Sequence, residues 1–448
     1  MPHRDAIRKF DARPNLTNMK SYNSSFSSGI SLLMTTLLAI GATAPAAENQ
    51  PTTLNEAYKD HFYLGVAINR TITMNAAVRA DNVNRSMDQI NKDISVVTEQ
   101  FNQISPENDL KWALIQPNPG PDGYNFAPAD AFVNFGLTHH MYIVGHTLVW
   151  HGQTPGWVFQ GTNLSSAANN SLAPRPALAD NTNAPGTNGF RGRRFNRGFG
   201  GFNLNGPHAS REELLQRMHD HIATVVGRYK GKIKVWDVVN EALADGGTNI
   251  LRSSPWERII GPDFIAKAFE YAHEADPNAI LRYNDYSLEN PAKRQKLITL
   301  IKSLQAQGVP IMAIGSQTHV SVTSPSFEEE DKVLTDLETL GLPIHITELD
   351  VNSAQGGQRS ISGDVAANAA TTQGGLVSDA DKKQADAYVE LFRAFKKHEK
   401  FVKVITFWGV NDGVSWRAQG RPLLFDANDR PKPACEALIR LASGEQPK

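Results

Sequence analysis

The sequence has little cysteine and no excess of either charge. Its 448 residues include one cysteine, Cys435, which excludes an internal disulfide and a cysteine-based zinc cluster. Lysine and arginine together number 45 against 46 aspartates and glutamates, so no general attraction to nucleic acid or anionic membranes is expected. With 40% hydrophobic residues, the composition is that of a globular protein long enough for one large barrel or several smaller domains.

Motifs of several other protein classes are also missing. No glycine-rich phosphate loop follows the first expected strand, which disfavours an open doubly wound sheet. The chain has no HExxH zinc-peptidase motif and no GxSxG nucleophile elbow. His146 and His151 are five residues apart in an expected strand and its loop, so their side chains need not face the same way. We therefore expect a site without metal or cofactor.

The first 46 residues predict a targeting segment. Lys20 precedes the apolar run GISLLMTTLLAIGATA, which closes in Ala44-Pro45-Ala46. A charged start, a short apolar middle and an Ala-x-Ala ending are typical of a secretory signal. The run is shorter than the ~20 residues of a membrane span. We expect residues 1–46 to be an upstream extension and a signal peptide, and the mature protein to be secreted or periplasmic and free of the membrane.

From residue 52 onward, short β-branched or aromatic runs alternate with helical periodicity, which indicates βα units and a parallel sheet. Helix starts are marked by Ser210 with Glu213 and by Ser378 with Asp381, as in a capping box. The pattern predicts a (β/α)8 TIM barrel within a single catalytic domain over 47–445. The expected strands span 61–69, 101–108, 141–150, 233–242, 279–286, 311–319, 343–350 and 402–410.

Two stretches rich in small and polar residues interrupt this alternation. Residues 161–207 follow the third expected strand, and residues 353–377 follow the seventh. Their composition favours flexible, solvated loops over packed elements. Because both connections leave the carboxyl ends of strands, we expect two insertions on the catalytic face of the barrel.

Nearly every expected strand begins apolar and ends in polar side chains. In a barrel these ends converge on one face, which predicts a single cleft. Glu241 ends WDVVNE and Glu348 lies in HITELD, at strands on opposed sides of the barrel mouth. Either carboxylate alone could be structural, but the pair favours glycosidic bond cleavage, which needs a proton donor and a nucleophile or base. The flat faces of Trp150, Trp157, Trp408 and Trp416 are suited to packing against sugar rings.

Seven ordered motifs carry a family resemblance. ENDLKW, HTLVWHGQ, WDVVNEA, YNDY, GSQTH, ITELD and WGVNDGVSW resemble the signature blocks of glycoside hydrolase family 10, the retaining endo-β-1,4-xylanases, over residues 55–440. The resemblance implies a glycosidase that hydrolyses internal xylan bonds through a covalent glycosyl-enzyme. Its partners would be xylan and xylo-oligosaccharides, with no nucleic acid, and it would act as a monomer.

By position, the resemblance implies that Glu348 is the nucleophile and Glu241 the acid/base, with Asn240 binding the sugar 2-hydroxyl. His319 would orient Glu348 and pair with Asp350. Tyr286 would border the leaving-group side. The remaining substrate-binding residues would be Glu107, Asn108, Lys111, His146, Trp150, Gln153, Gln317, Trp408 and Trp416.

The chemistry adds physical requirements. A retaining mechanism places the two carboxyl groups ~5–5.5 Å apart, with Glu348 ionised and the pKa of Glu241 raised. For any single polar residue of the set, a local structural hydrogen bond is an equally good interpretation. Two alternatives for the whole chain stay open: a barrel glycosidase acting on β-glucan or mannan, and a non-catalytic xylan-binding protein.

Overall fold

The computed structural model describes residues 52–77, 85–161, 207–353 and 378–444. All of these residues belong to one compact unit, residues 50–448. The predicted targeting segment, residues 1–46, lies outside the described residues. So do the predicted insertions at 161–207 and 353–377, apart from their edge residues.

Eight parallel strands close into a barrel, which confirms the predicted (β/α)8 fold. Each barrel strand pairs with the next one along the chain, and the last, β10, pairs with both β9 and β1. Seven of them lie within stretches predicted as strands, and β9 extends two residues beyond the predicted end at Asp350. The barrel strands are β1 (Tyr63–Ile68), β2 (Gln103–Pro106), β3 (Tyr142–Gly145), β5 (Val235–Asn240), β6 (Ile280–Asp285), β7 (Ala313–Ser316), β9 (Ile344–Asn352) and β10 (Val402–Phe407).

Two predicted strands are each divided in the structure. Residues 141–150 form β3 and the short β4 (Val149–Trp150), and residues 311–319 reach from β7 into β8 (His319–Ser321). The second division occurs at Thr318, whose φ of 56° lies in the left-handed region and turns the chain out of an extended strand. β4 pairs with β5 and β8 with β9, so both prolong the barrel wall on the side where its strands end.

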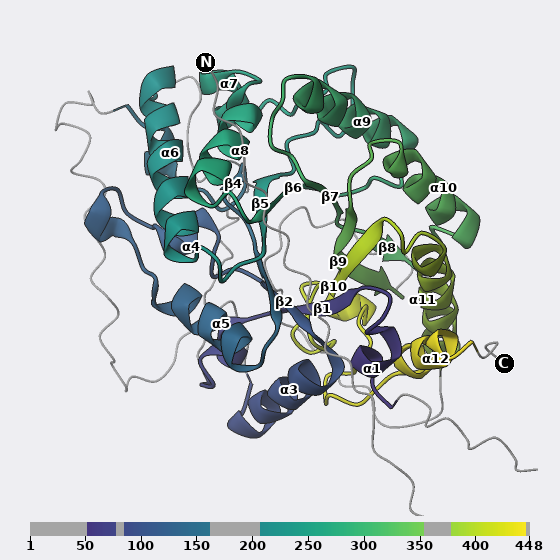
Figure 1. Ribbon diagram of the computed structural model, residues 1–448. Helices are drawn as coiled ribbons and strands as arrows, with labels where there is room; N and C mark the ends of the chain where they lie inside the picture. The colour runs from purple at the N-terminus through teal and green to yellow at the C-terminus, as the bar shows by residue number, and fades with distance from the viewer. Residues whose placement is uncertain (1–51, 78–84, 162–206, 354–377, 445–448) are drawn as a thin grey trace, which may run out of the picture. The chain divides into compact units, whose positions relative to one another are not determined.

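Helices surround the ring of strands in Figure 1, as expected for βα units. The longer ones are α3 (Met87–Gln100), α5 (Ala127–Thr138), α6 (Arg211–Arg228), α8 (Phe264–Ala275), α9 (Pro291–Ala306), α10 (Phe327–Glu338), α11 (Asp379–Lys397) and α12 (Pro433–Ala442). The shorter ones are α1 (Leu54–Tyr58), α2 (Arg70–Thr73), α4 (Trp112–Ile115), α7 (Pro255–Ile260) and the 3-10 turns η1 (Pro121–Gly123), η2 (Gly156–Phe159) and η5 (Ala418–Gly420).

The predicted capping residues begin two of these helices. The Ser210 hydroxyl accepts a hydrogen bond from the Glu213 amide at 3.1 Å, and the Ser378 hydroxyl accepts one from the Asp381 amide at 3.2 Å. Each bond satisfies an amide that lacks a partner within the first helical turn. The Glu213 carboxylate pairs with Arg217 one turn further along the helix, so this half of the expected capping box takes another partner.

The barrel interior holds a layer of buried charge below the strand ends. Arg282 on β6 donates two hydrogen bonds to Asp237 on β5, at 2.7 and 2.9 Å. Burial opposes ionisation of Asp237, but Arg282 and His146 more than offset it and lower the pKa of this carboxyl to about 2. The Asp237 carboxylate is also 2.9 Å from His146 Nδ1, and His146 lines the cleft above this layer.

Candidate active site

A cleft lies where the barrel strands end. Its empty volume is about 790 Å3, part of it open to solvent, within the range of about 300–1,000 Å3 usual for ligand sites. Polar groups and tryptophans share its walls, which suits a ligand with both hydroxyl groups and apolar faces. The lining residues are Lys111, His146, Trp150, Asn240, Glu241, Tyr286, Ser287, Gln317, His319, Glu348, Trp408, Trp416 and Arg417.

Glu348 lies in β9, with 6% of its surface exposed. Its Oε1 accepts a hydrogen bond from Asn284 Nδ2 at 2.8 Å, and its Oε2 is 3.2 Å from His319 Nε2. Burial alone would raise the pKa of this carboxyl. The His319 hydrogen bond and the electrostatic effects of His146 and His319 outweigh burial and hold the pKa below its ordinary value. The surroundings of Glu348 therefore favour the carboxylate.

His319, in β8, bridges Glu348 and Asp350. Its Nδ1 is 2.8 Å from Asp350 Oδ2. Burial opposes a charged imidazole, but the two carboxylates prevail and raise the pKa of His319 to about 9. Asp350, fully buried, also accepts a hydrogen bond from Trp416 Nε1 at 2.9 Å and forms an ion pair with Arg417. Asp350 thus fixes both the orientation and the charge of the histidine.

Glu241 directly follows β5, with 7% of its surface exposed. Trp150 Nε1 donates to its Oε2 at 2.9 Å, and Gln317 Nε2 donates to its Oε1 at 3.0 Å. Burial raises the pKa of this carboxyl, and the negative charge of Glu348 raises it further, against the opposing effect of the Gln317 and Trp150 hydrogen bonds. The two glutamates are thus biased in opposite directions, Glu241 toward the acid and Glu348 toward the carboxylate.

A pair of amides connects the two glutamates. Asn284 Nδ2, which binds Glu348, is also 2.9 Å from Asn240 Oδ1. Asn240 Nδ2 in turn donates to Glu241 Oε1 at 3.2 Å. Sequence reasoning placed Asn284 at a strand end without giving it a role in the site. The signal that could have identified it was its position two residues after Arg282, because alternate residues of a strand face the same side.

Several other predicted residues are in contact with one another at the cleft. Lys111 Nζ donates to Asn108 Oδ1 at 2.9 Å and lies 5.2 Å from the centre of the Trp150 ring. The rings of His146 and Trp408 meet edge to face at 5.1 Å. Glu107, Asn108 and Gln153 are not among the residues that line this cleft, but Asn108 Oδ1, which accepts the Lys111 hydrogen bond, is also 3.5 Å from Gln153 Nε2. Asp350 likewise does not line the cleft but contacts His319.

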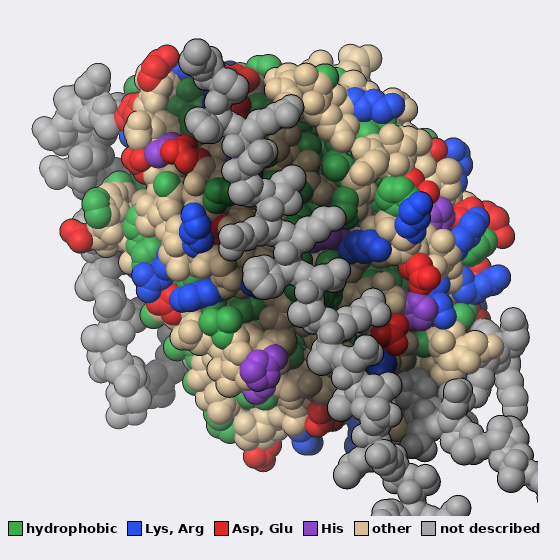
Figure 2. All heavy atoms as spheres, viewed as in Figure 1, with side chains coloured by type: hydrophobic (Ala, Val, Ile, Leu, Met, Phe, Trp, Pro, Cys, Tyr) green, Lys and Arg blue, Asp and Glu red, His purple; other side chains and the backbone are tan. Residues whose placement is uncertain are grey.

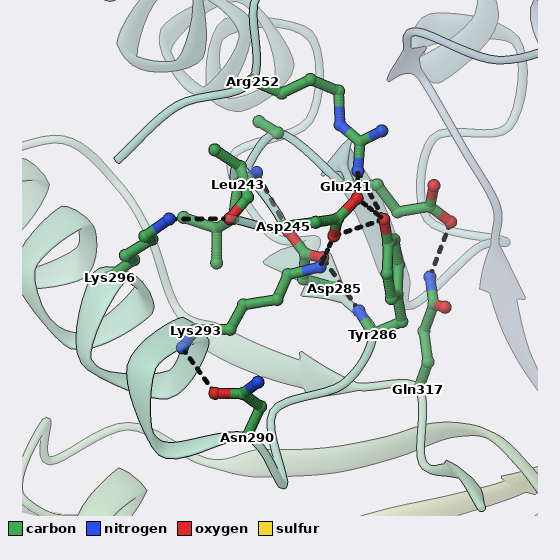
Figure 3. A network of polar contacts seen from close by, with 12 residues as sticks. Glu241, Leu243, Asp245, Arg252, Asp285, Tyr286, Asn290, Lys293, Lys296 and Gln317 are labelled. Atoms are coloured by element: carbon green, nitrogen blue, oxygen red, sulfur yellow. Dashed lines mark hydrogen bonds and ion pairs between the residues drawn. The ribbon is translucent and has the colours of Figure 1, made fainter. Parts of the chain in front are cut away.

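Tyr286 also lines the cleft, within a network of charged groups (Figure 3). Its hydroxyl donates to Asp245 at 2.6 Å and accepts a hydrogen bond from Arg252 at 2.5 Å. Lys293 Nζ is 3.2 Å from the centre of the Tyr286 ring and 2.9 Å from Asp245 Oδ1. These contacts fix the position of the Tyr286 ring beside Glu241.

One expectation changes and two residues are added. Trp157, considered as a sugar platform, lines a separate hollow with Tyr124, and its indole N–H donates to the Pro117 carbonyl at 3.1 Å. Ser287 and Arg417 line the cleft but were not predicted, because loop residues carry no strand-end pattern. Among the described residues, no group of three or more His, Cys, Asp or Glu side chains is arranged to hold a metal ion.

Comparisons with known proteins agree with one another. A family model described as "Glycosyl hydrolase family 10" matches residues 53–175 and 201–441. An endo-1,4-beta-xylanase of Geobacillus stearothermophilus is 36% identical over 395 residues, which cover 87% of this chain and 98% of the relative. Endo-1,4-beta-xylanase A of Caldicellulosiruptor sp. (strain Rt8B.4) is 36% identical over 88% of this chain, but the match spans only 48% of that relative.

Solved structures extend the likeness to three dimensions. A mutant of the intracellular xylanase TsXylA from Thermoanaerobacterium saccharolyticum, in complex with xylotetraose, superposes with a TM-score of 0.66 at 34% identity. The match covers 87% of this chain and 99% of that one.

Proposed function

Because the chain belongs to glycosyl hydrolase family 10, and is therefore a glycoside hydrolase, we propose that it is a retaining endo-β-1,4-xylanase. Its substrates are xylan and xylo-oligosaccharides, cleaved at internal β-1,4 bonds. The observation that carries the proposal is the opposite bias of the two glutamates, since double displacement needs one carboxylate and one carboxylic acid.

In the first step the Glu348 carboxylate attacks the anomeric carbon of the sugar. The bond from that carbon to the leaving oxygen breaks, and Glu241 donates its proton to this oxygen. Asn284 and His319 hold Glu348 in place for the attack. The product is an ester between Glu348 and the sugar, and Glu241 is left ionised.

In the second step Glu241 acts as a base. It takes a proton from water, whose oxygen attacks the anomeric carbon, and the bond to Glu348 breaks. This restores both carboxyl groups to their starting protonation states. Because each attack inverts the anomeric carbon, two steps retain its configuration. The carboxyl separation of ~5–5.5 Å that this mechanism requires stays a prediction.

Neither alternative is favoured. A barrel enzyme for β-glucan or mannan would share the two glutamates, but the relatives described above are xylanases. A non-catalytic xylan-binding protein would have no need for opposed protonation states. The chain carries similar numbers of basic and acidic residues, and side chains of both signs occur over the face in Figure 2, which suits an uncharged polysaccharide better than a polyanion.

The substrate class is tested by incubating residues 47–448 with xylan, β-glucan and mannan in parallel. We expect short xylo-oligosaccharides from xylan, and a loss on the order of 10⁴-fold or more in Glu348→Gln. Glu330→Gln is the matched control, because Glu330 is a buried glutamate of α10 outside the cleft and its loss should leave xylan cleavage unchanged. Preferential cleavage of glucan or mannan would overturn the assigned substrate, and binding without cleavage would support the non-catalytic alternative.

We further propose that the mature protein is an exported monomer, secreted or periplasmic, that does not stay with the membrane. The support is the signal-like pattern of residues 1–46. In the described part of the chain, no helix is long and apolar enough to cross a membrane. Fractionation of cells expressing the full chain, with sequencing of the mature N-terminus, tests the proposal: a cytoplasmic protein that keeps residues 1–46 would contradict it.

A further inference from the structure

The backbone that carries Glu241 turns sharply at the end of β5. Glu241 has a φ of 58°, in the left-handed region that residues other than glycine seldom occupy, so its surroundings must hold this conformation. Three successive amides are bound by groups of β6. The amide of Glu241 donates to the Asn284 carbonyl at 2.9 Å, that of Ala242 to the Tyr283 hydroxyl at 3.0 Å, and that of Leu243 to Asp285 Oδ2 at 3.2 Å.

Asp285 is the centre of this arrangement, as Figure 3 shows. Its Oδ2 also accepts the Tyr283 hydroxyl at 2.7 Å. Its Oδ1 accepts the Tyr286 amide at 2.9 Å and is 2.9 Å from Lys293 Nζ on α9. The carboxylate is fully buried, so every one of its interactions is with protein. The two oxygens of Asp285 therefore hold two segments in place: Oδ2 binds the turn that follows Glu241, and Oδ1 binds the backbone of Tyr286.

Hydrogen bonding alone does not explain why residue 285 is a charged aspartate. A buried ion pair is costly to desolvate, and an asparagine could accept a hydrogen bond from the Leu243 amide without that cost. The Asp285 carboxylate, however, also acts electrostatically on Glu241. Burial is the main cause of the raised pKa of Glu241, and Glu348 and Asp285 both add to it. The positive groups that Figure 3 labels in this network are Arg252, Lys293 and Lys296. Arg252 is bound by Asp245 and Tyr286, Lys293 pairs with Asp245 as well as with Asp285, and Lys296 Nζ donates to the carbonyls of Ala244 and Gly246.

We propose that Asp285 is a positioning residue of the reaction: it fixes the turn from Glu241 to Leu243, and its buried charge favours the protonated form of Glu241. The inference rests on the proposed double displacement, in which Glu241 is the acid of the first step. It predicts that losing Asp285 impairs proton donation much more than it impairs attack by Glu348.

The test is Asp285→Asn, assayed on two aryl β-xylobiosides. A dinitrophenyl leaving group departs with little acid assistance, whereas a poor phenol leaving group needs the proton from Glu241. We expect kcat/KM to fall roughly 10- to 100-fold for the poor leaving group and less than about threefold for the good one. The alkaline limb of the kcat/KM profile should move to lower pH, because the pKa of Glu241 falls when a nearby negative charge is removed.

Asp412→Asn is the matched control. Asp412 is also a buried aspartate that accepts a backbone amide, from Leu423 at 2.9 Å, and pairs with a lysine, Lys432, at 3.0 Å. It does not line the cleft. It should lower the unfolding temperature about as much as Asp285→Asn, with no change in leaving-group dependence or in the pH profile.

Tyr283→Phe tests the positioning of the Glu241 turn separately from the charge of Asp285. It also keeps the inference testable if Asp285→Asn does not fold. It removes the acceptor of the Ala242 amide but leaves the Asp285 carboxylate. We expect a loss on the poor leaving group without a shift of the alkaline limb. Equal losses on both substrates, or no loss on either, would overturn the inference. Failure of the proposed function would be distinct: Glu348→Gln would then retain the wild-type rate on the good leaving group.

Discussion

At the scale of the residue, Glu241 and Glu348 are chemically identical and differ only in their neighbours. Glu348 receives Asn284 and a charged His319, and both stabilise its carboxylate. Glu241 receives three neutral donors, Trp150, Gln317 and Asn240, which do not compensate for burial and for the nearby negative charge. Two similar side chains can therefore take opposite roles in one proposed mechanism.

The same contacts make His319 a source of pH-dependent stability. Its pKa is raised to about 9 in the folded protein, against ~6.5 when unfolded. A raised pKa means that folding favours the protonated imidazole. The contribution to the free energy of unfolding is therefore complete below pH ~6.5 and disappears as the pH rises to about 9, with an upper magnitude of about 3 kcal/mol.

Urea unfolding of wild type and His319→Asn at pH 6 and pH 9 measures this contribution. The wild type should lose more free energy of unfolding than the variant over this interval. Parallel losses in the two proteins would show that His319 does not contribute to the pH dependence. At pH 9 the imidazole is about half protonated, so most of its contribution is already lost and the difference between the two proteins should be small.

The residues of the site could be predicted to different degrees. Glu241, Glu348 and His319 end apolar runs, and a barrel gathers such ends on one face, so pattern alone places them together. Arg417 had no such signal, because it belongs to a loop after β10. Its contact with Asp350 depends on how that loop folds back over the cleft.

At the scale of the element, side chains of β6 and β9 fill the space beside the middle of β7, so only glycine fits at position 315. A Cβ on Gly315 of β7 would lie 2.4 Å from Asn284 Oδ1 and 2.9 Å from Thr347 Cγ2. Thr347 holds that same Asn284 oxygen at 2.6 Å, so the amide has no room to retreat. The lack of a side chain at Gly315 therefore positions the amide that binds Glu348.

Gly315→Ala should displace Asn284 and weaken its hydrogen bond to Glu348. A hydrogen bond to a charged group contributes about 1.5–3 kcal/mol, so we expect kcat to fall roughly 10- to 100-fold on xylo-oligosaccharides. Gly227→Ala is the control, because a Cβ there meets nothing within 4 Å on the exposed side of α6. It should keep full activity and gain up to about 1 kcal/mol in unfolding free energy. Wild-type activity in Gly315→Ala would contradict this account of β7.

The positions of strands and helices could be predicted from the sequence, but the points where a predicted strand divides in two could not. Apolar runs located all eight barrel strands, and serine caps located the starts of α6 and α11. The division of β7 from β8 depends on the left-handed backbone of Thr318. Threonine has no intrinsic preference for that conformation, so tertiary contacts must impose it. The residues around Thr318 therefore do not predict where the strand divides.

At the scale of the whole molecule, barrel closure makes one site from distant parts of the chain. The pairing of β10 with β1 completes the ring, and the cleft takes residues from Lys111 to Arg417. The sequence predicted this convergence because strand ends in a closed parallel barrel share one face. It could not predict what residues 161–207 and 353–377 contact, since polar, glycine-rich composition encodes no packing partner.

The central claim is that Glu348 forms a covalent bond to the sugar. The most direct measurement is to incubate the protein with an activated 2-deoxy-2-fluoro-xylobioside, which slows hydrolysis of the glycosyl-enzyme, and to locate the added mass by peptide mass spectrometry. We expect one fluoroxylobiosyl group on the peptide that contains Glu348, and none in Glu348→Gln. Labelling of a different residue, or turnover with inversion at the anomeric carbon and no labelled protein, would contradict it.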